Sequence, residues 1–74
     1  MANENEIQQN QIEDFLIIEK ALRHYKKQLN NNFAAVAYIS ESHETKEIVR
    51  ENIQAMQRRT DLLISKTVNQ INTL

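Results

Sequence analysis

Three residue types that interrupt helices or cross-link chains are missing from this sequence of 74 residues: glycine, proline and cysteine. Without cysteine, disulfides and thiolate metal sites are excluded. Glycine allows backbone conformations that tight turns require, and proline interrupts helices and β-ladders. Their absence argues against an all-β fold, a P-loop or a dinucleotide-binding turn. Long, uninterrupted helices remain, and the sequence therefore predicts an all-α protein.

A large excess of one charge is also missing, because nine Lys and Arg residues face ten Asp and Glu residues. This balance creates no broad basic field for nucleic acid or anionic lipid. The longest apolar run, residues 33–39, is far shorter than the roughly 20 residues of a membrane-spanning helix. The acidic and polar residues 1–6 are unlike a signal peptide. We therefore expect no membrane partner and a cytoplasmic location, in the host cytoplasm if the protein is viral.

Residues 6–29 have the apolar periodicity of a first helix, after a frayed segment at residues 1–5. Its seam, the stripe expected to face a neighbouring helix, alternates by three and four residues: Phe15, Ile18, Leu22, Tyr25 and Leu29. Ile12, Leu16 and Ile17 lie outside this seam, so the helix is apolar around more than half its circumference. One neighbour needs a stripe of only about 100°. This excess indicates a bundle or an oligomer.

Two polar segments are expected to interrupt the chain. Asn30, Asn31 and Asn32 predict a helix stop, because Asn competes for backbone hydrogen bonds and tolerates the left-handed conformation. Residues 33–39 are apolar and rich in alanine, which favours a short second helix, with a buried strand as the alternative. Ser40–Ser42 then offers candidate N-caps. The chain is therefore expected to reverse near the Asn triplet and again near these serines.

Residues 42–72 predict a third, long helix. Its apolar seam again alternates by three and four: Thr45, Val49, Ile53, Met56, Thr60, Leu63, Thr67, Ile71 and Leu74. A second, shorter strip comprises Ile48, Ala55 and Leu62. Both long helices are acidic early and basic late, which suits their macrodipoles. An antiparallel pairing of these helices would place the basic end of one beside the acidic start of the other.

Catalytic and metal-binding patterns are not recognisable. His24 and His43 lack a ligand spacing, so solvated histidines are predicted, with metal binding conceivable only across chains. No nucleophile is paired with a base, since neighbouring residues such as Ser42 and His43 do not form a triad. The sequence therefore predicts a protein that is not an enzyme and that has no cofactor. Basic residues that could contact phosphate form two clusters, for which solvated helix faces are the favoured interpretation: Arg23, Lys26, Lys27, Arg58 and Arg59.

Together these patterns predict one all-α domain in which two long antiparallel helices, joined by a short apolar helix, are completed by oligomerisation. The predicted function is a helical protein–protein interaction module, acting as a regulator, inhibitor or adaptor; a phage-encoded inhibitor is one form of it. The alternatives are a dimeric nucleic-acid binder using the basic residues above and a structural self-assembling subunit. The residues predicted to line the oligomer or partner interface are Ile12, Leu16, Ile17, Phe33, Val36, Ile39, Ile48 and Leu62.

Overall fold

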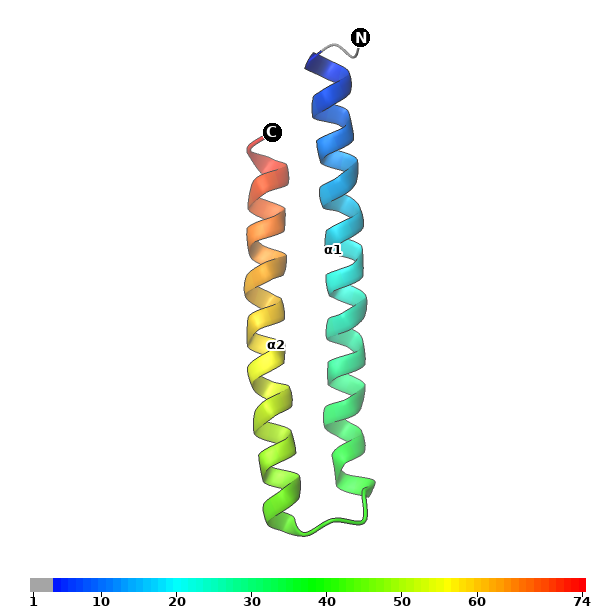
Figure 1. The fold of residues 1–74 in the computed structure, drawn as a ribbon, viewed down its shortest axis with the longest axis vertical. Coiled ribbons are helices and arrows are strands. Elements are labelled where there is room, and N and C mark those ends of the chain that lie inside the picture. The colour runs from blue at the N-terminus through cyan, green and yellow to red at the C-terminus, as the bar shows by residue number, and fades with distance from the viewer. Residues whose placement is uncertain (1–3) are drawn as a thin grey trace.

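The structure is a computed structural model that describes residues 4–74, and it forms a hairpin of two long helices (Figure 1). Helix α1 spans Glu4–Ala35, a 3-10 turn η1 spans Val36–Tyr38, and α2 spans His43–Asn72. The helices run antiparallel, side by side, so the start of α1 and the end of α2 lie at the same end of a rod of 60 × 16 × 15 Å. Helix makes up 91% of the described chain, and no strand occurs there. The all-helical prediction is confirmed, and the strand alternative for residues 33–39 is excluded.

The predicted helix stop at the Asn triplet is wrong. Helix α1 continues through Asn30, Asn31 and Asn32 to Ala35, and the chain reverses only once, between the two long helices. Asn in a helix costs only about 0.5 kcal/mol per residue relative to alanine. Ending the helix at residue 29 would instead withdraw Phe33 and Val36 from the seam, where they pack with the core. Packing therefore outweighs local propensity here.

The predicted short helix at residues 33–39 is divided in the structure. Its first three residues end α1, and Val36–Tyr38 form the 3-10 turn. Ile39 has an extended backbone conformation, and its amide donates to the Val36 carbonyl at 3.3 Å. At the other end of the chain, the predicted fraying of residues 1–5 falls largely outside the described residues, although residues 4 and 5 belong to α1.

The predicted break near Ser40–Ser42 and the start of the last helix are confirmed. Ser42 is the N-cap of α2, and its hydroxyl oxygen accepts a hydrogen bond from the Thr45 amide at 3.2 Å. Glu44 places a negative charge in the first turn, where the helix dipole favours it. The Lys46 ammonium group donates to the Ala37 carbonyl at 3.2 Å and so ties the new helix to the turn.

The core of the hairpin is small and lies near the turn. It consists of Leu29, Val36 and Ile53, with Phe33 and Val49 packed against it. Farther along α2, Thr60 and Thr67 of the predicted stripe are buried together with Ile64 beside it, whereas Met56 and Leu63 of the same stripe are exposed. Two helices alone share only one seam, so this narrow line is all that the hairpin can enclose.

The seam of α1 differs from the predicted one. Phe15, Leu22 and Leu29 face α2 as expected, but Glu19 and Lys26 alternate with them. Ile18 and Tyr25, predicted to be in the seam, remain exposed. Because α1 is apolar over more than one stripe, its periodicity alone could not decide which part would face α2.

The charge argument identified the antiparallel direction but not the contacts. In the part of the chain described, one ion pair joins the helices, between Lys26 and Asp61, and Asp61 lies outside the acidic start of α2. The remaining ion pairs lie within single helices, such as that of Arg23 with Glu19. Exposed pairs of this kind contribute less than about 1 kcal/mol each.

Candidate interaction surfaces

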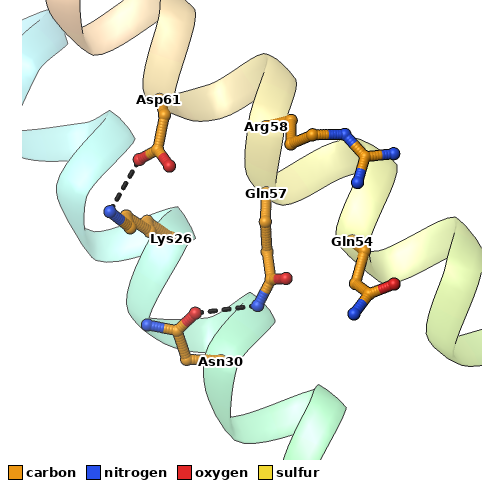
Figure 2. A pocket seen from close by; sticks show the side chains of 6 residues that line it. All are labelled: Lys26, Asn30, Gln54, Gln57, Arg58 and Asp61. Atoms are coloured by element: carbon orange, nitrogen blue, oxygen red, sulfur yellow. Dashed lines mark hydrogen bonds and ion pairs between the residues drawn. The ribbon is translucent and has the colours of Figure 1, made fainter.

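One side of the hairpin carries a polar hollow between the two helices (Figure 2). The hollow is open and has a volume of about 340 Å³. Across it, the Lys26 ammonium lies 2.6 Å from an Asp61 carboxylate oxygen, and the Gln57 amide donates to the Asn30 side-chain oxygen at 2.8 Å. Residues four apart on one helix thus meet residues four apart on the other. These two bridges hold the antiparallel register of α1 against α2.

The lining of the hollow is polar throughout. It contains amides, two cations and one carboxylate: Lys26, Asn30, Gln54, Gln57, Arg58 and Asp61. Among the residues that the structure describes, no three His, Cys, Asp or Glu side chains come together as metal ligands. His24 and His43 are exposed on different helices, and the His24 ring lies 3.4 Å from the Gln28 amide nitrogen.

The opposite side of the seam is apolar. Tyr25 directly precedes Lys26 in the sequence, so its side chain lies about 100° away around α1. The Tyr25 hydroxyl lies 3.6 Å from the Met56 sulfur. Ile18 lies seven residues before Tyr25, and Leu63 lies seven residues after Met56. Because the helices are antiparallel, the same register places Ile18 level with Leu63. We use the name apolar face for six large side chains that are each 39–50% exposed on this side: Ile7, Ile18, Tyr25, Met56, Leu63 and Leu74.

A second apolar surface lies on the outer side of α2. Ile48, Ala55 and Leu62 recur every seven residues, so they share one stripe of the helix. This stripe, here the outer strip, points away from α1, since it lies about half a turn from the buried residues Ile53 and Thr60. Ile48 is 58% exposed and Leu62 is 60% exposed.

The eight interface residues predicted from sequence fall into two groups. Val36 is buried in the hairpin core, and Ile12 and Phe33 are half-buried along the seam, so these three stabilise the hairpin itself. The other five are exposed: Leu16, Ile17, Ile39, Ile48 and Leu62.

The apolar face was missed as a surface because five of its residues continued the predicted seams, namely Ile18, Tyr25, Met56, Leu63 and Leu74. Glu19 and Lys26 are seven residues apart and lie on either side of Leu22 in the sequence. Their spacing was the signal that a second stripe of α1, containing these two residues, could face α2 instead.

Of the five basic residues predicted as alternative nucleic-acid contacts, the structure brings together Lys26 and Arg58, which both line the polar hollow, but not the other three. Arg23 donates to Glu19 at 2.9 Å, and Lys26 is paired with Asp61. Arg58 lines the polar hollow, whereas Arg59 lies about 100° farther around α2, on the side of Met56 and Leu63. Two of the five charges are therefore neutralised within the hairpin, and the others are dispersed over different sides.

Comparisons with other proteins give no relative, since no family model, curated protein or solved structure matches the chain. Neither helix in the described range has an apolar stretch long enough to cross a bilayer.

Proposed function

We propose that the protein is a non-catalytic helical interaction module that acts by binding another protein, as a regulator, inhibitor or adaptor. The outer strip is the observation that carries this proposal. Ile48 and Leu62 are more exposed than most large apolar residues of the hairpin, and no other part of the described chain covers them. Burying both would stabilise a complex by about 1–2 kcal/mol per side chain.

The outer strip has the dimensions of a helix-docking site. From Ile48 to Leu62 it extends over about 21 Å of α2, or roughly four helical turns. Apolar residues at a spacing of seven fit a partner helix laid along the strip, which is a common mode of recognition. The partner expected from this geometry is a protein that presents an amphipathic helix or a groove of similar length.

Charges beside the outer strip would give the complex a direction. Glu44 and Glu51 flank Ile48, whereas Arg58 and Lys66 flank Leu62 at helical spacing. A partner with basic residues near Ile48 and acidic residues near Leu62 would be favoured, and the reversed orientation would bring like charges together. Such charges select the partner and its orientation more than they strengthen binding.

The proposal is tested by capturing partners from the native host with the tagged full-length chain and then measuring the affinity of the purified pair. Leu62→Asp should weaken that affinity about 30-fold or more, because a charge would be buried in an apolar contact. Gln54→Asp is the matched control, since it adds the same charge to the same helix on the polar side. Equal binding by wild type and Leu62→Asp would exclude the outer strip as the docking site.

A further inference from the structure

The isolated hairpin exposes far more surface than a compact protein of its mass. Its accessible area is 5946 Å² for 8.7 kDa, whereas a folded monomer of this mass exposes about 4,700 Å². The radius of gyration is 17.5 Å, against about 11 Å for a compact chain of this length. The excess of roughly 1,200 Å² arises because two helices side by side share a single seam. A second layer of helices is therefore missing from the single chain.

The apolar face has the pattern expected of a surface covered by such a layer. On α1, residues alternating by four and three form one strip: Ile7, Gln11, Asp14, Ile18, Ala21 and Tyr25. On α2, the same alternation forms a second strip, Met56, Arg59, Leu63, Lys66 and Gln70, and Leu74 follows just beyond the end of the helix. The contact between Tyr25 and Met56 shows that both strips lie on the same side of the hairpin.

The two strips carry opposite charges. Asp14 is the charged residue of the α1 strip, and Arg59 and Lys66 are those of the α2 strip. All three are exposed, and none forms an ion pair with another described residue. A face with one acidic and one basic strip is complementary to a copy of itself, provided that the α1 strip of each copy meets the α2 strip of the other.

We infer that the apolar face is covered by a second copy of this chain, giving a four-helix bundle with a two-fold axis parallel to the helices. This axis lays α1 of each copy over α2 of the other, antiparallel. Rotation about this axis does not shift the second copy along the helices. The register of α1 against α2 within one hairpin therefore also sets the register between the copies. Ile18 then packs near Leu63 of the second copy, and Asp14 lies within about one helical turn of its Lys66.

The other two-fold arrangement of the same faces is disfavoured by charge. An axis perpendicular to the helices would lay α2 against α2, so that the basic strip of one copy, with Arg59 and Lys66, would face the basic strip of the other. Like charges placed opposite each other in this way act against the wrong assembly.

The area available is sufficient for a specific dimer. Six side chains that are each two-fifths to one-half exposed represent roughly 500 Å² per copy, at about 200 Å² for a fully exposed residue of this size. The pair would bury about 1,000 Å² from these side chains alone, which reaches the lower range of specific interfaces. Ile48, Ala55 and Leu62 stay outside this dimer interface, so the inference does not depend on the proposed partner binding; Lys66, which flanks Leu62, borders both surfaces.

Sedimentation of the full chain over a concentration series tests the dimer. We expect twice the 8.7 kDa chain mass at micromolar concentration. Leu63→Asp should raise the dimer dissociation constant about 100-fold or more, because it places a charge inside the bundle. Leu62→Asp, the same change at the next residue, should leave the dimer intact, since Leu62 belongs to the outer strip. Circular dichroism of each variant verifies that the helices remain, and Ile18→Asp repeats the test on α1.

The arrangement of the dimer is tested with engineered cysteines, because the chain has none of its own. A mixture of Ile18→Cys and Leu63→Cys chains should form a disulfide-linked heterodimer on oxidation, while Ile18→Cys alone should not cross-link. Cross-linking of Ile18→Cys alone, without the mixed product, would overturn the proposed axis. A monomer at high micromolar concentration, or equal masses for Leu62→Asp and Leu63→Asp, would overturn the dimer. If a monomeric chain still captured a partner protein, the dimer would be excluded but the proposed function would not be.

Discussion

Thr60 and Thr67 occupy buried positions in the seam of α2, where apolar side chains would ordinarily be expected. Each hydroxyl donates to the carbonyl four residues earlier, Thr60 to Met56 at 2.7 Å and Thr67 to Leu63 at 2.8 Å. Because those bonds stay within α2, they satisfy the buried hydroxyls but add nothing across the seam. The two threonines therefore narrow the apolar contact between α1 and α2.

Replacing Thr60 with valine should stabilise the protein. The change exchanges a buried hydroxyl for a methyl group and removes a bond that competes with regular helix geometry. We expect the free energy of unfolding, measured by chemical denaturation, to rise by about 0.5–1 kcal/mol. Thr73→Val is the control, because its hydroxyl makes a similar bond to the Gln70 carbonyl at an exposed site. A lower stability for Thr60→Val would show that the hydroxyl bond outweighs apolar burial.

At the scale of single elements, α1 shows how packing extends a helix through residues of weak propensity. All three residues of the Asn triplet are exposed, and Asn30 accepts a hydrogen bond from Gln57. The turns on both sides contribute Leu29 and Phe33 to the seam. Local propensity opposed the helix by less than the burial of these residues favoured it. The end of α1 is therefore set by packing and cannot be predicted from the Asn triplet alone.

Two substitutions of Asn31, which is exposed, test this helical conformation. Asn31→Ala should raise the free energy of unfolding by about 0.5 kcal/mol, because alanine is the better helix former. Asn31→Pro should lower it by roughly 3 kcal/mol, because proline removes a helical hydrogen bond and clashes with the preceding turn. Thermal unfolding followed by circular dichroism measures both. A turn at this site, as sequence predicted, would tolerate the proline with little loss.

The start of α2 depends on one side chain. Ser42→Ala removes the hydroxyl that accepts from the Thr45 amide and should lower the free energy of unfolding by about 1 kcal/mol. Ser40→Ala lies two residues earlier in the exposed turn and should change stability by less than about 0.5 kcal/mol. Urea denaturation of the two variants distinguishes them. Equal effects would mean that the cap does not stabilise the helix in solution.

At the scale of the whole molecule, the hairpin is long relative to its core. Leu29, Val36 and Ile53 gather near the turn. Farther from the turn, the seam of α1 is only half-buried, and among the described residues Ile64 is the one large apolar side chain that α2 buries there. Much of the apolar surface therefore remains on the outside, on the apolar face and on the outer strip. Stability of the folded chain should accordingly depend on association.

This dependence should appear in the melting temperature. If folding and dimer formation are coupled, the midpoint of thermal unfolding should rise by roughly 5–10 °C over a 100-fold increase in protein concentration. Leu63→Asp should melt lower and with little dependence on concentration. Differential scanning calorimetry over the series provides the measurement. A midpoint of the wild type that does not move would contradict coupling between folding and association.

Several features could be predicted from the sequence because they depend on local chemistry or simple periodicity. The absence of glycine and proline indicated long helices, and the apolar spacing indicated a stripe on each. Ser40–Ser42 marked the break because a serine hydroxyl can replace the missing acceptor at a helix start. The opposed charge gradients indicated the antiparallel direction. Each of these properties acts within a few residues or along a whole helix, so no knowledge of the neighbour was needed.

Only the tertiary structure decided which part of each apolar surface is the seam. Ile18 and Tyr25 fit the helical spacing as well as Glu19 and Lys26 do, and the choice between them rests on contacts with α2. The fate of the Asn triplet and the pairing of Lys26 with Asp61 were settled by the same contacts. The physical reason is that a helix apolar on several sides has several possible seams of similar energy. Its sequence shows that a neighbour is required, whereas the neighbour's own side chains determine the side on which it packs.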